Sequence, residues 1–428
     1  MKRLAQIALA GLAAAILAGV LVAQTASAQA IDPASDLGQF RKLRAEGMAA
    51  FEQNDPTGAM AALTKAGDIL PDSPSILLLK AQVAIKQRKP ADARAALKDY
   101  LTRGYVLDLR KNADFNAVWD AGLNDLEEGN ESPLGKMQVM SSSPDFVITE
   151  GLAYVPESSE LYLSGIRSGA VTVLSATGAR DVITFRPGVA AYAIGLRDGS
   201  IWATTAASRQ TQGYDAKAAI SSKIVVIDPA SGQVSKTFSD PAKMRRFGHM
   251  LMGRDDLYVT DGEHGEILRL NAYQGELQTL VPEGYMDSPD ALAENEGATS
   301  LVVADFVSGL YRVDLTSGSM ARLLPPADGS LLGISWLSRY GNDLIAIQTG
   351  FKPNRILRLH MAEDWSEVKS VEVLLRSDKL LAQPTQGAVV GDTLIFVAKS
   401  QWDNLDDQGN PIKPEPGETV IGTIKLAP

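Results

Sequence analysis

Six residues open six similar stretches of the sequence beyond about residue 145, and three of them carry carboxylate or imidazole groups. The six are Glu150, Ala191, His249, Asp290, Gly333 and Gln386. Equivalent positions of a cyclic repeat converge on its axis, although they lie far apart in the sequence. Carboxylates brought together in this way raise each other's pKa unless a cation lies between them. The pattern therefore predicts a cation site if the repeat closes into a ring.

Signatures of several other catalytic sites are absent from the sequence. The chain has no cysteine, no G-x-S-x-G, no H-E-x-x-H, no Walker loop and no G-x-G-x-x-G. These absences exclude a thiol nucleophile and thiolate metal ligands, and they give no support to a serine-hydrolase elbow or a nucleotide-binding loop. The carboxylates and the three histidines are what remains for chemistry.

Short strand-like runs separated by turns fill the region that carries these residues. In the first unit, Leu161-Tyr162-Leu163 follows the turn at Ser158-Ser159, and a later strand ends at Ala176-Thr177-Gly178. Successive units begin roughly 40 to 60 residues apart, which is the spacing of four-stranded propeller blades. We expect a six-bladed β-propeller over residues 137–428. An open β-sandwich is the alternative, but sandwich strands do not recur as a four-strand repeat.

The last unit is short of one strand. Its final strand is expected at Thr419 to Leu426, and we predict that Met137 to Ser142 supplies the missing one. Pairing N-terminal with C-terminal residues would close the ring and remove both exposed sheet edges.

Residues 36–123 have the apolar spacing of helices instead. Pro56 and Pro90 stand 34 residues apart, and Ala62-Leu63 has its counterpart in Ala96-Leu97. Small residues at helix crossings with this period resemble tetratricopeptide repeats. A degenerate third piece, from Leu109 to Leu126, would cap the stack. Such a module either binds a protein partner or docks on the propeller as a helical cap. Residues 124–136 are polar and without periodicity, and are expected to form a linker. The fold class is thus multidomain, α and β.

The N-terminus has the three regions of a secretory signal peptide. Lys2-Arg3 precedes an apolar run, and Ala26-Ser27-Ala28 supplies small residues for cleavage after Ala28. Residues 1–28 are therefore expected to direct export, to the periplasm, with no stable membrane insertion after cleavage. An uncleaved membrane anchor is the alternative, because the apolar run is close to spanning length.

The charge balance restricts the partners. Removing Lys2 and Arg3 changes the formal net charge from −10 to −12, and the isoelectric point is about 5.0. No basic block is present, which argues against binding nucleic acid or an anionic membrane surface.

Residues 143–426 resemble the family of senescence marker protein, gluconolactonase and luciferin-regenerating enzyme. The resemblance rests on Glu150-Gly151-Leu152, on Ser288-Pro289-Asp290-Ala291-Leu292 and on the rhythm between them. It implies a six-bladed propeller with a divalent cation in the central channel, and Glu150, His249 and Asp290 as its ligands. Oxygen ligands suit calcium, and the added imidazole favours zinc. The cation would polarise a lactone carbonyl and lower the pKa of a bound water.

The sequence departs from the family pattern at three points. Ala291 replaces a typical glycine, the third-unit asparagine has become His249, and the second unit has Ala191-Tyr192 where an asparagine lies beside the metal. Glu150 can alternatively cap a strand or pair with an arginine such as Arg167. Asp290 can equally be a turn aspartate that bonds its own backbone.

Tyr192, Trp336 and Gln386 are the candidates to line the substrate channel, and Trp202 and Trp402 are further aromatic candidates for its mouth. Aromatic residues of propeller strands also pack between blades, so the aromatic candidates have that alternative. The insertion from Gln401 to Gly417 lacks the ligand spacing of a calcium loop and is expected to be a solvated flap.

Two functions follow. The first is a metal-dependent hydrolase of a small lactone or ester. The second is a non-catalytic propeller that binds a sugar-like molecule or a protein, with the helical repeats as an interaction module.

Overall fold

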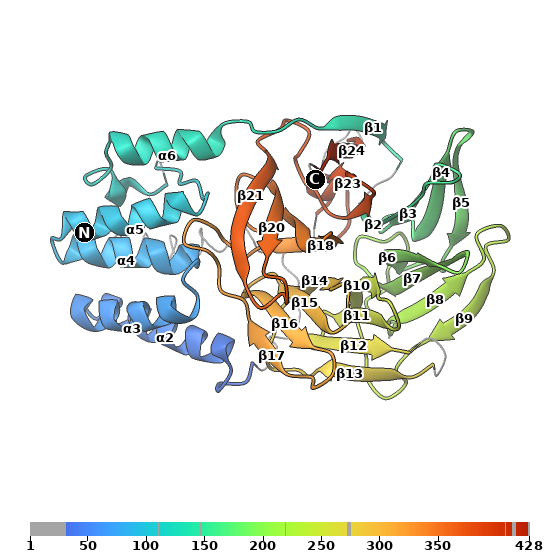
Figure 1. Ribbon diagram of the computed structural model, residues 1–428, viewed down its shortest axis with the longest axis horizontal. Coiled ribbons are helices and arrows are strands. Elements are labelled where there is room, and N and C mark those ends of the chain that lie inside the picture. The colour runs from blue at the N-terminus through green and yellow to red at the C-terminus, as the bar shows by residue number, and fades with distance from the viewer. Residues whose placement is uncertain are drawn as a thin grey trace.

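The computed structural model describes residues 31–109, 111–145, 148–218, 220–271, 275–406, 408–412 and 417–426. The expected signal peptide, residues 1–28, lies outside these ranges. Within them, a group of helices stands beside a ring of β-sheets, next to strands β17 and β21 (Figure 1). The expected fold class is confirmed: a helical repeat region is followed by a six-bladed β-propeller.

The helical region consists of antiparallel helices in the expected places. The described helices are α2 (Asp36–Glu52), α3 (Pro56–Ile69), α4 (Pro74–Lys86), α5 (Pro90–Thr102), the 3₁₀ turn η1 (Ala113–Phe115) and α6 (Ala121–Glu131).

Local sequence explains where these helices begin. Ser35, Asp55 and Asp120 cap α2, α3 and α6 by accepting a backbone N–H of the first turn. Proline opens α3, α4 and α5, at a position that needs no N–H. Gly47 allows α2 to approach α3, because a Cβ there would lie 2.8 Å from the Leu63 side chain. The small residue at this crossing fits the repeat pattern.

Each blade of the propeller is an antiparallel four-stranded sheet. Blades 1 to 3 consist of β2 (Thr149–Val155), β3 (Glu160–Gly165), β4 (Ala170–Ser175), β5 (Gly178–Thr184); β6 (Val189–Arg197), β7 (Ser200–Ala207), β8 (Lys223–Ile227), β9 (Val234–Phe238); and β10 (Phe247–Met252), β11 (Leu257–Asp261), β12 (Glu266–Leu270), β13 (Leu277–Val281).

Blades 4 to 6 complete the ring. They consist of β14 (Pro289–Glu294), β15 (Ser300–Asp305), β16 (Gly309–Asp314), β17 (Met320–Arg322); β18 (Ile334–Tyr340), β19 (Asp343–Gln348), β20 (Arg355–Met361), β21 (Val368–Arg376); and β22 (Gly387–Val390), β23 (Thr393–Lys399), β24 (Thr419–Lys425) with β1 (Gln138–Ser143).

The expected ring closure is confirmed. Strand β1 pairs antiparallel with β24, with Val139 opposite Gly422 and Ser143 opposite Thr419. Blade 6 therefore takes its outermost strand from the N-terminal end of the propeller, and the alternative of an open sandwich is wrong.

Six apolar cores, one between each pair of neighbouring blades, hold the ring together. Successive side chains of a strand point to opposite faces of its sheet, so each inner strand contributes to two cores. In β18, Leu337 packs against blade 4 while Trp336 packs against blade 6. The innermost strands contact one another in ring order.

The helical region docks on blades 4 and 5 through buried polar contacts. Asp72, fully buried, accepts hydrogen bonds from the Leu331 amide (2.9 Å) and the Ser330 hydroxyl (3.2 Å), and it lies 3.4 Å from Arg322. Tyr105 donates to the carbonyl of Asp72 and packs edge-on against Phe351 at a centroid distance of 4.7 Å. The helices therefore form a cap on the propeller, as one of the two interpretations expected.

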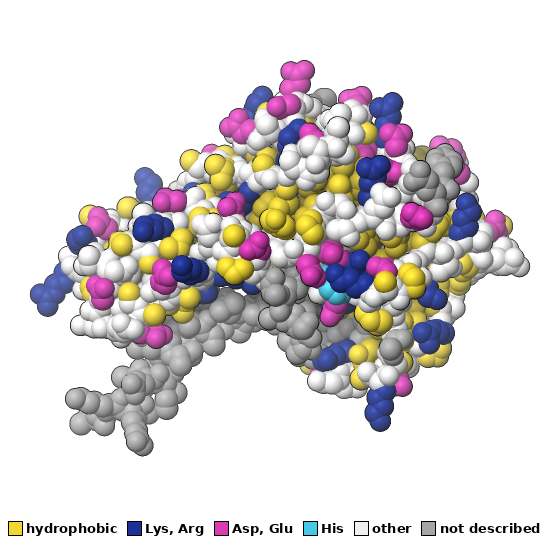
Figure 2. Space-filling model, turned by 90° about the horizontal axis from the view of Figure 1, so that it is seen from below, with side chains coloured by type: hydrophobic (Ala, Val, Ile, Leu, Met, Phe, Trp, Pro, Cys, Tyr) yellow, Lys and Arg dark blue, Asp and Glu magenta, His cyan; other side chains and the backbone are white. Residues whose placement is uncertain are grey.

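The expected linker, residues 124–136, begins inside α6. Helix α6 continues to Glu131, and Leu134 forms a β-bridge with Arg376 of blade 5. Among the described helices, none is both long and apolar enough to cross a membrane. On the face shown in Figure 2, basic and acidic side chains alternate without an extended basic area.

Candidate functional site in the central channel

A β-bulge occurs at the start of the innermost strand in blades 1 to 5. The pairing with the second strand shifts there, after Thr149, Ala191, Phe247, Pro289 and Ile334. An extra residue in one strand bends it and redirects a side chain. The bulges contain Glu150, Tyr192 with Ala193, Gly248 with His249, Asp290, and Ser335.

The residue equivalent to these in blade 6 is Gln386, which precedes β22. Its carbonyl accepts the amide of Val397. Glu150, Tyr192, His249, Asp290, Ser335 and Gln386 are all partly accessible, whereas the residues before each bulge are buried. Asp290 influences the pKa of Glu150, and Glu150 influences that of Tyr192, so these positions of different blades lie near one another. We call the six the ring residues.

Glu150 and Asp290 lie in blades 1 and 4, which face each other across a ring of six. Burial raises the pKa of Glu150 to about 7; the Trp402 indole, which donates to the Glu150 carboxylate, opposes the rise, and Asp290 adds to it. Burial likewise raises the pKa of Asp290 to about 7, with a further rise from Asp305 and an opposing effect of Arg246. Two desolvated carboxyls that disfavour negative charge thus share this level of the channel.

The side chain of Gln386 in blade 6 acts to raise the pKa of His249 in blade 3, against a larger effect of burial. These blades also face each other, so the two side chains come from opposite sides of the ring. Burial lowers the pKa of His249 to about 4, which keeps the imidazole neutral at pH 7. Its Nδ1 is buried without a hydrogen-bond partner among the described residues.

Tyr192 and Arg246 complete the polar surroundings. Burial raises the pKa of Tyr192, while the Ser208 side chain and the charge of Arg246 oppose the rise. Arg246 precedes β10, and its guanidinium donates to the carbonyl of Gly262 at 2.8 Å. Its influence on both Tyr192 and Asp290 places a positive charge near these two side chains.

Trp336 is not part of this site. It is 3% exposed and packs in the core between blades 5 and 6. The bulge at Ser335 explains why Trp336 is buried. Ser335, the extra residue, takes the position facing the channel, and the Trp336 side chain is directed into the core between the two sheets. The structure thus corrects Trp336 as a channel candidate, whereas Tyr192 and Gln386 belong to the ring residues.

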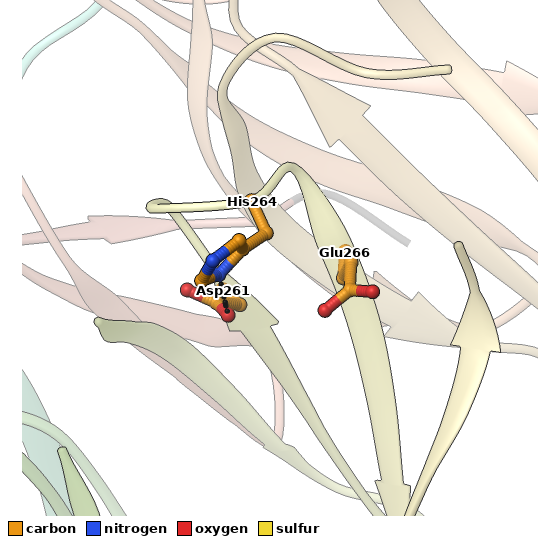
Figure 3. Close-up of side chains that lie close together, drawn as sticks. All are labelled: Asp261, His264 and Glu266. Atoms are coloured by element: carbon orange, nitrogen blue, oxygen red, sulfur yellow. Dashed lines mark hydrogen bonds and ion pairs between the residues drawn. The ribbon is translucent and has the colours of Figure 1, made fainter. Parts of the chain in front are cut away.

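The described residues contain one compact group of acidic and histidine side chains, Asp261, His264 and Glu266, whose ligand atoms lie within 4.8 Å of one another (Figure 3). It lies around the hairpin between β11 and β12. Glu150, His249 and Asp290 do not form such a compact group in the described structure.

The Asp261 group is an ion-pair network. Asp261 accepts the backbone amides of Arg246 and Glu263 on one oxygen, both at 3.0 Å, and Arg245 and His264 on the other, at 3.0 and 2.9 Å. Arg245 also pairs with Glu266 and Asp240. Both oxygens of the central carboxylate are therefore occupied, and a cation would have to displace a buried guanidinium.

Asp261 also has a structural role, which is to fix the loop before an innermost strand, and this role recurs in neighbouring blades. Asp261, Asp305 and Gln348 occupy the position that pairs with the first residue of the innermost strand. Asp305 accepts the amides of Asp287 and Ser288, and Gln348 donates to the carbonyls of Ser330 and Leu332. Each therefore fixes the loop that leads into the innermost strand.

Sequence reasoning missed Arg246 and Ser335, and it named Trp402 for the channel mouth without predicting its contact with Glu150. Ser335 stands two residues after Gly333, the start of its unit, so the repeat offered a signal for it. Arg246 lies three residues before His249, outside the repeated pattern. Trp402 belongs to the expected solvated flap, yet it donates to Glu150.

One family model matches the chain, described as tetratricopeptide repeat, over residues 50–104. No curated protein matches it. Similar solved structures include a nidogen/laminin complex, with 15% identity and a TM-score of 0.41, covering 53% of this chain and 80% of that one.

Two single-enzyme structures are also similar. A putative oxidoreductase (glucose dehydrogenase) from Thermus thermophilus has 14% identity and a TM-score of 0.43, covering 68% of this chain and 99% of that one. A luciferin-regenerating enzyme has 12% identity and a TM-score of 0.45, covering 69% and 95%. The strand pairing itself defines the six-bladed fold.

Proposed function

We propose that this protein is an exported, metal-dependent hydrolase of a small lactone or ester, with Glu150, His249 and Asp290 as the cation ligands. The observation that supports the proposal is that these residues occur at the β-bulges of three blades, at corresponding positions of the innermost strands. Export to the periplasm rests on the signal-peptide pattern of residues 1–28.

The donors suit a divalent cation. A bound cation would supply a positive charge next to the two carboxyls, whose pKa values are about 7. The unpartnered Nδ1 of neutral His249 offers a lone pair to the cation. Carboxylate oxygens favour calcium, and the imidazole favours zinc. When bound, such a cation supplies Lewis acidity to a carbonyl and lowers the pKa of a coordinated water.

The remaining groups of the site would hold the substrate. Tyr192 and Gln386 offer hydrogen bonds to a lactone or sugar-like molecule, and Arg246 offers positive charge to the carboxylate that hydrolysis produces. None of these groups is a nucleophile on a strained turn, so the proposal assigns the attack to water.

Calorimetric titration of purified, chelator-treated protein with CaCl₂ and ZnCl₂ tests the proposal. We expect one cation to bind, and Asp290→Ala to abolish both binding and turnover of a simple δ-lactone followed with a pH indicator. Asp255→Ala is the matched control, because Asp255 is an exposed turn residue outside the channel. Lactone turnover that survives Asp290→Ala would move the site elsewhere.

The second candidate function is a non-catalytic binding protein. It is favoured by the second blade, which contributes Tyr192 and Ala193 at the bulge where the family resemblance calls for an asparagine beside the metal. In this role the channel takes a sugar-like ligand, and the tetratricopeptide-like helices take a protein partner. Cation binding without lactone turnover would favour it.

A further inference from the structure

A long connection, residues 400–418, joins β23 to β24, and its described part reaches from blade 6 to blade 1. This part begins with Gln401 and the short 3₁₀ turn η2 (Trp402–Asn404). The indole N–H of Trp402 donates to Oε1 of Glu150. The Trp402 ring packs against the buried cluster of Ile148, Ile166 and Ala190. A side chain from the loop thus reaches a carboxylate of the channel.

Contacts on both sides hold the loop in this place. Arg167 of blade 1 donates to the carbonyl of Gly409 at 2.8 Å and to that of Gln210 at 3.0 Å. Gly409 has φ +80°, and a Cβ there would lie 2.6 Å from the Arg209 carbonyl. At the other end, Gln401 donates to the Thr419 hydroxyl at 2.9 Å. The loop is therefore anchored to blades 1, 2 and 6.

We propose that Trp402 is a positioning residue for Glu150. Its hydrogen bond determines which oxygen of the Glu150 carboxylate meets the cation. This inference rests on the proposed function. The indole nitrogen is a donor only and cannot bind a cation. Since it occupies one lone pair of Oε1, it favours Oε2 as the oxygen that meets the cation. The last torsion of a glutamate is broad, so one fixed hydrogen bond restricts it substantially. Outer partners of this kind typically change metal affinity by about 10- to 100-fold.

Two substitutions separate the hydrogen bond from the packing of the ring. Trp402→Phe keeps an aromatic ring and removes the N–H, whereas Trp402→Gln removes the ring and keeps an N–H donor. Trp365→Phe is the matched control: Trp365 donates its indole N–H to the Asn342 carbonyl at 2.8 Å, in blade 5. Thermal melts of all variants report whether they fold.

The readout is the dissociation constant for CaCl₂ and ZnCl₂, measured by calorimetric titration of the full mature chain. We expect Trp402→Phe to weaken cation binding by about 10-fold or more, Trp402→Gln to recover part of that loss, and Trp365→Phe to bind as the wild type does. Cation addition should also change the tryptophan fluorescence of the wild type and of Trp365→Phe, but not of Trp402→Phe.

The outcomes distinguish this inference from the proposed function. If the wild type binds a cation and Trp402→Phe binds it equally well, the positioning role is overturned while the cation site stands. If Trp402→Gln binds more weakly than Trp402→Phe, ring packing and not the donor is responsible, and the role is again overturned. A wild type that binds neither cation overturns the proposed function together with the role of Trp402.

Discussion

At the scale of single residues, the channel holds carboxyl groups in an environment that opposes their charge. Glu150 and Asp290 each reach a pKa of about 7, chiefly through burial. In the range between the ordinary carboxyl pKa and 7, the folded protein retains protons that the unfolded chain has lost. The free energy of unfolding therefore decreases as the pH rises through this range.

This sign gives a prediction for Asp290→Asn. In the presence of a chelator, the variant should melt at a higher temperature than the wild type. The difference in melting temperature should be larger at pH 8 than at pH 5. The reason is that asparagine removes one group whose ionisation opposes folding, at about 1.4 kcal/mol per pKa unit. Thermal melts at the two pH values measure it.

Saturating cation should reverse the wild-type trend, because bound cation stabilises the ionised carboxylates. Asp255→Asn, at an exposed turn, controls for the loss of any one carboxylate. If Asp290→Asn and the wild type lose stability equally between pH 5 and pH 8, the Asp290 carboxyl does not have a raised pKa.

At the scale of strands, the bulges depend on close approach between blades. A Cβ on Gly151 would lie 2.2 Å from the Tyr192 carbonyl and 2.8 Å from the Ser164 hydroxyl. The glycine after Glu150 is thus needed for packing, independently of any metal, because it lets β2 and β6 meet beside the channel.

Gly151→Ala should therefore destabilise the protein by roughly 1–3 kcal/mol, the usual cost of overpacking. Gly129→Ala is the control, since that position in α6 has open space around its Cβ and alanine favours a helix by about 1 kcal/mol. Urea unfolding of both variants measures the difference. A Gly151→Ala protein as stable as the wild type would mean that β2 and β6 can move apart at no cost.

The strands also show how much of the fold and of the site could be predicted from the sequence. The blade repeat, the closing strand before Ser143 and the helix pairs at Pro56 and Pro90 were all predictable, because turns, alternation and prolines are local signals. Trp336 was not, since a one-residue bulge at Ser335 reverses which side chain faces the channel, and alternation cannot locate a bulge. The contact of Trp402 with Glu150 joins residues from different blades, so local pattern gives no sign of it.

At the scale of the whole molecule, the helical region and the propeller share one buried interface. Arg322 is 4% exposed at its side chain, and it donates to the carbonyls of Ile69 and Ser308 besides facing Asp72. Asp72 is its buried carboxylate partner across the interface. Removing that carboxylate would leave a buried positive charge without its counter-charge.

Asp72→Ala should lower the free energy of unfolding by about 3–5 kcal/mol, the range seen when one partner of a buried pair is removed. Asp68→Ala, at an exposed position of the nearby helix α3, should have little effect. Chemical denaturation followed by circular dichroism compares the two. Equal stability of both variants would show that the helices dock without this contact.

The pairing of β1 with β24 has a consequence for the order of folding. Blades 1 to 5 are made of consecutive hairpins, which can form as soon as each has been synthesised. Blade 6 joins strands from the two ends of the propeller sequence, so β1 stays unpaired until the last strand exists. The entropy of closing a loop grows slowly with its length, by about 0.6 kcal/mol per doubling. The distant pairing thus slows folding more than it lowers stability. Strand β1 must be kept from aggregating until the synthesis of the chain is complete.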